Sequence, residues 1–206
     1  RAQDDVPVAL SLGQSADVRE MLFRLGWQQV AALKIAQLLI RPENVLKRKL
    51  GRAGAWVAGV GLRAAAKMAV GPQTATGDVR EIARFDATHD ALWNVMARDV
   101  QCGVVRDASF LNWKYVDQPG QQYVRLELLQ NGQPVGVAVL LFRDADDVYA
   151  YRRASLVDVV APLHDDDVLR RVVAMAIDAA TRGGADSLTC MHTHPRLTHA
   201  LRDCGF

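Results

Sequence analysis

Three consecutive stretches with the pattern of β-strands constrain the fold of this chain more than any other part of its sequence. Residues 123–130 alternate apolar and polar side chains, and Asn131-Gly132 separates them from an apolar run at 134–142. An Asn-Gly pair between two such runs is a strong signal for a β-hairpin. A third strand pattern covers 148–162 and is apolar on both faces from 156 to 161, as in a buried central strand. We therefore expect three antiparallel strands at the centre of the fold.

Helix and strand patterns alternate on both sides of these strands. Downstream, three aspartates at 165–167 supply an N-cap and first-turn charges for a helix that Gly183-Gly184 should end. Upstream, residues 78–85 have the pattern of a strand and 86–100 that of a capped helix. This order predicts an α+β fold with a mixed, mostly antiparallel sheet flanked by helices. The last two elements expected are a strand at 186–192 and a helix at 195–206, which opens with proline.

The composition narrows the class of protein. With 206 residues, 50% of them hydrophobic, the chain can bury one good core. A net charge of +2 gives no overall attraction to nucleic acid, so no such partner is expected, and no oligomeric state is indicated. Three cysteines without a Cys-x-x-Cys spacing argue against a disulfide scaffold and favour a reducing cytoplasm. The first residues lack a basic stretch followed by an apolar run, so no signal peptide is expected.

The two ends of the chain share one pattern. Residues 6–27 and 185–206 both read as a strand, a break, a short helix and a glycine followed by an aromatic residue. Repetition of a whole supersecondary unit is typical of tandem domains, although any strand-loop-helix that ends in glycine looks similar. We expect residues 1–40 to be the C-terminal part of a first unit, 41–77 a basic, small-residue linker helix, and 78–206 a domain that lacks its last strands.

Residues 41–67 carry seven basic side chains and a single acid, Glu43, and they place Trp56 among small residues. Such a helix fits a peripheral membrane contact with anionic lipid or glycan precursors. A solvated linker helix between two halves explains the same composition, and both interpretations stay open. The longest weakly charged run, at 53–62, is too short to span a bilayer.

The stretch from 106 to 123, RDASFLNWKYVDQPGQQY, gathers aromatic side chains in a sequence that is only 6% aromatic. Together with the element order and the terminal Gly-Phe pair, it resembles the GNAT superfamily of acyl-CoA-dependent N-acyltransferases. Within that superfamily it is similar to a bacterial subgroup, partly of tandem proteins, with the signature Leu-x-Trp-[Arg/Lys]-Tyr-x3-Pro-x3-Tyr. The matching residues are Leu111, Trp113, Lys114, Tyr115, Pro119 and Tyr123.

This resemblance implies a GNAT-like fold (acyl-CoA N-acyltransferase fold), preceded by the tail of a related domain. It implies transfer of an acyl group from acetyl-CoA or another acyl-CoA to an amine, without a metal. The acceptor would be a small-molecule amine or a sugar of a cell-envelope precursor. In the family, the strand corresponding to 156–162 leads into a loop whose backbone N–H groups bind the CoA pyrophosphate. Carried over to this sequence, the cofactor-binding positions are Val159, Val160, Leu163 and His164.

Two positions depart from the pattern of the family. The loop at 163–168 has no glycine and contains three carboxylates, and Leu201 stands where many members have a tyrosine general acid. These departures favour an alternative, a degenerate non-catalytic GNAT-like binding module of a tandem protein. A third interpretation, an aminoacyl-transfer relative that uses a charged tRNA, requires a basic groove, for which only residues 41–67 are available.

Asp158 is the first candidate catalytic residue. A carboxylate inside a strand that is apolar on both faces must be paired or have a shifted pKa. Asp158 is therefore either a general base or the partner of an arginine such as Arg106 or Arg153.

His194 is the second candidate, as a base at the edge of the cleft. His192, His194 and His199 form a His-x-His-x4-His pattern, which is also found around transition metals. The helix that opens at Pro195 carries His199 away from the strand, so the base is the favoured role.

Asn112, Lys114 and Tyr115 fit two roles. In the first, they line an acceptor-binding cleft together with His192. In the second, the motif is structural: its apolar members pack a short helix against the sheet, the tyrosine hydroxyls find backbone partners, and Pro119 ends the helix. The apolar members are Phe110, Leu111 and Trp113.

Overall fold

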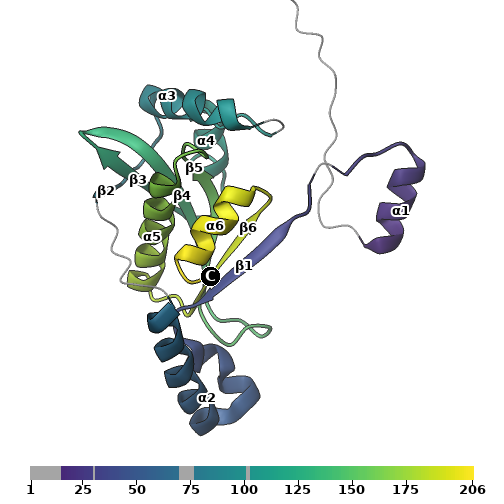
Figure 1. Cartoon of the computed structure of the whole chain (residues 1–206), viewed down its shortest axis with the longest axis vertical. Helices are drawn as coiled ribbons and strands as arrows, with labels where there is room; N and C mark the ends of the chain where they lie inside the picture. The colour runs from purple at the N-terminus through teal and green to yellow at the C-terminus, as the bar shows by residue number, and fades with distance from the viewer. Residues whose placement is uncertain (1–14, 30, 70–76, 101–102) are drawn as a thin grey trace, which may run out of the picture. The chain divides into compact units, whose positions relative to one another are not determined.

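The computed structural model describes residues 15–29, 31–69, 77–100 and 103–206 (Figure 1). The chain divides into two compact units, Arg1–Lys34 and Ile35–Phe206. The first unit contains helix α1 (Ala16–Arg24), in which Ser15 is the N-cap and no residue is buried. The second unit contains the hydrophobic core and the candidate site.

A single sheet of six strands organises the described part of the second unit, in the order β1-β6-β5-β4-β3-β2. Strands β2 to β5 pair with their neighbours in antiparallel fashion, and β5 and β6 are parallel. The predicted mixed, mostly antiparallel sheet is therefore confirmed. The strands are β1 (Lys34–Leu39), β2 (Asp78–Glu81), β3 (Tyr123–Gln130), β4 (Gln133–Arg143), β5 (Arg153–Val160) and β6 (Ser187–His192).

Helices cover both faces of the sheet (Figure 1). On one face, Gly136 of β4 lies against Val172 of α5. On the other face, His89 Nε2 of α3 lies 3.2 Å from Glu127 Oε2 of β3. Glu127 is paired across the strands with Val137, the residue that follows Gly136. Successive residues of a strand point to opposite faces, so α5 and α3 lie on opposite sides. The remaining bounds are α2 (Pro42–Ala69), α3 (Ala87–Met96), a 3-10 turn η1 (Ala97–Asp99), α4 (Ala108–Tyr115), α5 (Asp166–Arg182) and α6 (Pro195–Asp203).

The hairpin forms where the sequence predicts it, but two strands begin or end elsewhere. β2 ends at Glu81 instead of reaching residue 85, because the side-chain amide of Asn112 bonds both the N–H and the C=O of Phe85. β5 begins at Arg153 instead of residue 148. The carboxylate of Asp146 accepts from the N–H groups of Val148 and Tyr149, which fixes this stretch as a turn.

Strand β1 supplies the edge of the sheet next to β6. The N–H groups of Ile40 and Arg41 both donate to the C=O of Asp186, 2.9 Å away, so the end of β1 meets the start of β6. The carboxylate of Asp186 also accepts from Asn44 Nδ2 at 2.6 Å and from the N–H of Arg152 at 2.9 Å. The domain at 78–206 thus obtains an edge strand from residues 34–39.

The helices of the two predicted repeats end in the same hydrogen bonds. In α1, Gly26 N–H donates to Phe23 and Trp27 N–H to Leu22; after α6, Gly205 and Phe206 donate to Arg202 and Leu201 in the same way. Gly26 and Gly205 both have positive φ, 85° and 94°, as a Schellman cap requires. The strand half of the first repeat, residues 6–13, lies outside the described residues. The division into 1–40, 41–77 and 78–206 stays a prediction.

Gly136 allows β4 and α5 to approach closely. An added Cβ would lie 2.3 Å from Cγ2 of Val172, which is fully buried. We predict that Gly136→Ala lowers the free energy of unfolding by about 1–3 kcal/mol through overpacking. In urea unfolding, Gly136→Ala combined with Val172→Ala should lose less stability than the sum of the two single changes, because the smaller side chain makes room for the new methyl group. Strict additivity would contradict this contact.

Candidate functional site

The parallel strands β5 and β6 separate halfway along their length. They pair from Arg153 to Leu156 with Ser187 to Cys190, and the pairing stops there although both strands continue. On its other side, β5 pairs Leu156 with Leu140 and Asp158 with Val139, so that Val157 is an extra residue. Such a bulge bends its strand and increases the local twist. The sheet therefore opens between the carboxyl ends of two parallel strands.

An opening of this kind is a natural ligand site. Beyond Leu156 and Cys190, the backbone groups of β5 and β6 do not bond each other and can bond an extended ligand. In open α/β sheets, ligands also bind outside the carboxyl ends of parallel strands.

Asp158 lies just after the bulge and is 8% exposed. Its carboxylate accepts from Arg106 Nε at 2.8 Å, from the Tyr115 hydroxyl at 2.8 Å, and from the N–H of Val159 at 3.0 Å. The sequence predicted Arg106 or Arg153 as the partner of Asp158, and the structure has Arg106 in this role. Arg153 instead pairs with Asp146. With three donors engaged, Asp158 is held in a fixed position.

Tyr115 joins the aromatic motif to this carboxylate. It is 2% exposed, its ring meets that of Tyr123 edge-on, and burial together with the Asp158 charge raises its pKa, so the phenol stays protonated and donates. Burial also raises the pKa of Cys190 to about 12, with a further contribution from Asp158. The Cys190 thiol is thus protonated at neutral pH and is a poor nucleophile.

The rest of the motif is divided between packing and exposure. Asn112 uses both atoms of its side-chain amide on the backbone of Phe85, at 2.9 Å each. Lys114 Nζ lies 5.0 Å from the centroid of the Tyr115 ring. The expected packing of Trp113 against the sheet is wrong, since its side chain is 60% exposed. The members of α4 that are buried in the core are Ala108, Leu111 and Tyr115, spaced three and four residues apart.

The backbone N–H groups of the loop between β5 and α5 bond a carboxylate of the protein itself. Asp99 Oδ2 accepts from the N–H groups of Leu163 at 3.1 Å and His164 at 3.2 Å, and it lies 2.7 Å from His164 Nδ1. The hydrogen bond from His164 is the main cause that lowers the pKa of Asp99. Asp165 caps α5 by accepting from the N–H groups of Asp167 and Val168. A phosphate at this helix start would have to displace Asp99.

Three further predicted positions lie at the same end of β5 and β6. Val159 and Val160 are buried at the end of β5, and the N–H of Val159 bonds Asp158. His192 is a buried residue that ends β6. In the described part of the chain, no group of three or more His, Cys, Asp or Glu side chains has an arrangement suited to a metal ion.

His194 has the properties of a neutral base. It stands at the N-cap of α6 without making a side-chain cap bond, and its Nδ1 is a buried atom without a hydrogen-bond partner among the described residues. Burial lowers its pKa, and the nearby charge of Asp99 opposes this shift only in part. Since burial disfavours the imidazolium, His194 is neutral at pH 7.

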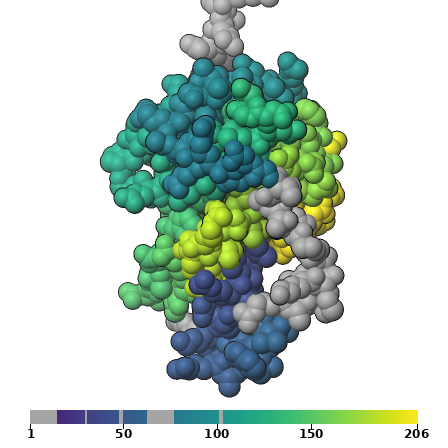
Figure 2. Space-filling model, turned by 90° about the vertical axis from the view of Figure 1, so that its left-hand side faces the viewer, coloured from purple at the N-terminus to yellow at the C-terminus, as the bar shows by residue number. Residues whose placement is uncertain are grey.

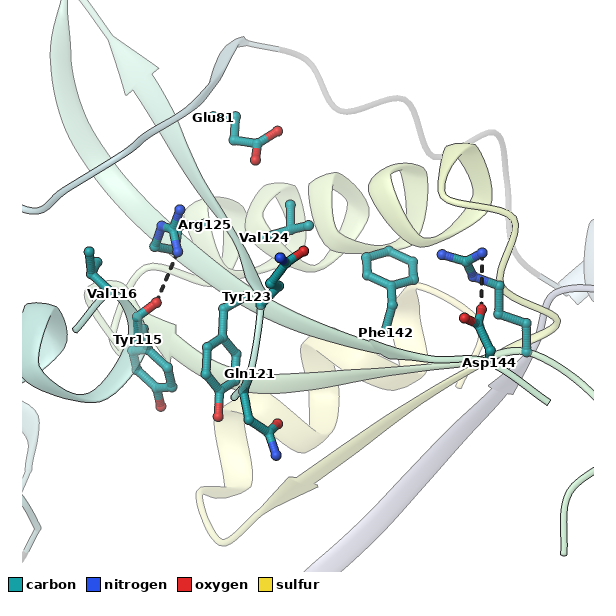
Figure 3. A pocket seen from close by; sticks show the side chains of 11 residues that line it. Glu81, Tyr115, Val116, Gln121, Tyr123, Val124, Arg125, Phe142 and Asp144 are labelled. Atoms are coloured by element: carbon teal, nitrogen blue, oxygen red, sulfur yellow. Dashed lines mark hydrogen bonds and ion pairs between the residues drawn. The ribbon is translucent and has the colours of Figure 1, made fainter. Parts of the chain in front are cut away.

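A polar cavity of about 580 Å³ lies at the opposite end of β5 (Figure 3). Figure 3 shows Tyr115 in its wall, with the backbone C=O bonded by Arg125 and the phenol directed away from that arginine. Arg152 and Asp144 form an ion pair, 3.2 Å apart, on the far side. The other lining residues are Glu81, Val116, Gln121, Gln122, Tyr123, Val124 and Phe142.

Comparison with known proteins identifies the fold. No protein-family model and no curated protein sequence matches the chain. Saccharomyces cerevisiae N-myristoyltransferase with bound myristoyl-CoA is similar in structure, with a TM-score of 0.56 and 11% identity over 84% of this chain and 47% of that one. A GCN5-related N-acetyltransferase from Anabaena variabilis has a TM-score of 0.54 and 10% identity over 85% of this chain and 37% of that one.

The domain therefore has the GNAT fold, as predicted. The chain spans less than half the length of these two structures, which share its fold at a low sequence identity.

The bond between Tyr115 and Asp158 should contribute to stability. We predict that Tyr115→Phe lowers the free energy of unfolding by about 1–3 kcal/mol, because it leaves one oxygen of a buried carboxylate without its donor. The matched control is Tyr149→Phe, at a tyrosine that is 43% exposed, where a change of about 0.5 kcal/mol or less is expected. Equal effects in urea unfolding would show that the Asp158 bond contributes nothing.

The pKa of His194 should reflect two opposing effects, burial, which lowers it, and the charge of Asp99, which raises it. We predict a pKa below the usual value of about 6.5, measured from the imidazole resonances by NMR and assigned with His194→Gln. Asp99→Asn should lower this pKa further, because it removes the negative charge that stabilises the imidazolium. Asp147→Asn, which removes the same charge from an exposed turn before β5, is the control. A rise on Asp99→Asn would contradict the arrangement.

Proposed function

We propose that this chain transfers an acyl group from an acyl-CoA to the amine of a small molecule, at the opening between β5 and β6. The observation that carries the proposal is the bulge at Val157 combined with the end of pairing at Leu156 and Cys190. Together they leave backbone groups of β5 and β6 unpaired with each other at the carboxyl ends of these strands, and His194 follows β6 at that end. The bound myristoyl-CoA of the yeast structure supports an acyl-CoA donor for this fold.

The opening between β5 and β6 suits the pantetheine arm of CoA. That arm is extended and contains two amides, so it can bond the free edge of β5 as an added strand would. Once the thioester lies beside the bulge, a backbone N–H near Val160 is suited to hold the oxyanion that forms on its carbonyl.

His194 is the proposed general base. Its neutral imidazole takes a proton from the ammonium of the acceptor, and the freed amine attacks the thioester carbon. The tetrahedral intermediate then collapses and the C–S bond breaks, and the new amide nitrogen gives up its surplus proton, which the departing CoA thiolate takes up. Asp158 is proposed as a positioning residue, because its oxygens are occupied by Arg106, Tyr115 and Val159.

The acceptor is proposed to be an amine or amino sugar, bound by Lys114 and His192, since the buried hydroxyl of Tyr115 already bonds Asp158. Asn112 is left out of this set because both polar atoms of its side chain bond Phe85. Cys190, a buried cysteine outside any disulfide, supports a proposed location in a reducing cytoplasm.

One observation favours a second function, a non-catalytic GNAT-like binding module. The carboxylate of Asp99 accepts hydrogen bonds from the N–H groups of Leu163 and His164, the positions at which the resemblance placed the CoA pyrophosphate. In such a module, this carboxylate would replace the ligand permanently.

Isothermal titration of the full chain with acetyl-CoA separates the two functions. For the transferase, we predict a dissociation constant below about 100 μM, or roughly −5.5 kcal/mol. His194→Gln should keep this affinity but lose acyl transfer to a panel of small amines, whereas the wild type transfers. Absence of heat at millimolar acetyl-CoA would favour the module.

Removal of the internal carboxylate tests the pyrophosphate position. We predict that Asp99→Ala binds acetyl-CoA at least about tenfold more tightly than the wild type, because two N–H donors become available to phosphate oxygens. Asp147→Ala removes the same charge at the other end of β5 and should leave the affinity unchanged. An equal gain in both variants would show a general charge effect and exclude this position.

A further inference from the structure

Helix α2 is a hairpin of two helical segments. Gly51 interrupts it with φ 66° and ψ 177°, outside helical geometry. Beyond this break the second segment folds back on the first, because a Cβ on Gly59 would lie 3.1 Å from the backbone N of Glu43. Ala55, one turn before Gly59, is 1% exposed. Small residues thus allow the two segments to pack closely.

The opposite side of the second segment is apolar and uncovered. Trp56 is 63% exposed, Val57 65% and Val60 44%, and their spacing places them on one face of the helix. Leu50, at the end of the first segment, is 51% exposed. Figure 2 shows this hairpin in blue at the lower end of the second unit. Exposed apolar clusters of this kind are typical of interaction sites.

The segment that carries this face is rich in basic residues. Residues 41–67 contain seven basic residues and one acid, whereas the whole chain has a net charge of only +2. Lys47 and Arg52 are exposed on either side of the Gly51 break. Glu43, the only acid, has its carboxylate against Gly59, between the two segments.

We propose that the α2 hairpin binds to the surface of an anionic lipid bilayer. The Trp56 face would enter the boundary between headgroups and acyl chains, and the basic residues would contact the anionic headgroups. In this proposal the hairpin lies in the plane of the bilayer surface. No helix in the described part of the chain is both long and apolar enough to cross a membrane. A second copy is a poor occupant of the face, because docking would bring two strongly basic segments together.

Co-sedimentation with vesicles tests this proposal on the full chain. We expect at least about tenfold stronger binding to phosphatidylcholine vesicles that contain about 30 mol% phosphatidylglycerol than to phosphatidylcholine alone. Binding should weaken in about 0.5 M NaCl, which screens the headgroup charge. Brominated acyl chains should quench tryptophan fluorescence in the bound state.

The variant Trp56→Ser, Val57→Ser, Val60→Ser should lose vesicle binding and the quenching but keep the melting temperature of the wild type, because all three side chains are exposed. Trp113→Ser is the matched control, since this tryptophan is 60% exposed on α4 and should not affect binding. Equal binding of the triple variant and the wild type would overturn the proposal. So would a dimer in solution that the triple variant abolishes, because a second copy would then occupy the face.

Discussion

A single buried carboxylate holds the opened sheet and the helix beside it together. Asp158 accepts from Arg106, which precedes α4, from Tyr115, which ends α4, and from Val159 in its own strand. All three donors converge one residue after the bulge at Val157. A buried charge is tolerated only when it is fully bonded, so the carboxylate ties the aromatic motif to the point where β5 leaves β6. The shape of the site depends on this bond set.

Much of the fold could be predicted because its signals are local. Asn131 and Gly132 have φ values of 52° and 75°, so the hairpin turn is encoded by the two residues that form it. The end of β2 could not be predicted, since it depends on Asn112 of α4, which bonds the backbone of Phe85 27 residues away. The start of β5 was missed although its signal is local, because Asp146 bonds the N–H groups of Val148 and Tyr149 within the same turn. The pairing of β1 with β6 also depends on contacts that no local pattern contains.

The candidate site was predicted only in part, for similar reasons. A carboxylate in an apolar strand needs a partner, so the pairing of Asp158 could be expected from the sequence. Trp113 was misplaced because the motif was considered as a whole; helical spacing puts Leu111 and Tyr115 on one side of α4 and Trp113 on the other. The role of Asp99 was missed altogether, because it depends on the distance between η1 and the loop before α5, which no pattern encodes.

The edge strand also determines the order in which the domain can be completed. β1 is bonded beside β6, and Asn44, just after β1, binds Asp186, 142 positions further on. During synthesis, β1 leaves the ribosome early and must wait until nearly the whole domain has been translated before its partner exists. Until then, its unpaired backbone can join a strand of another nascent chain. The backbone of β1 therefore needs protection from pairing with other chains during translation, a need that ends once β1 is bonded beside β6.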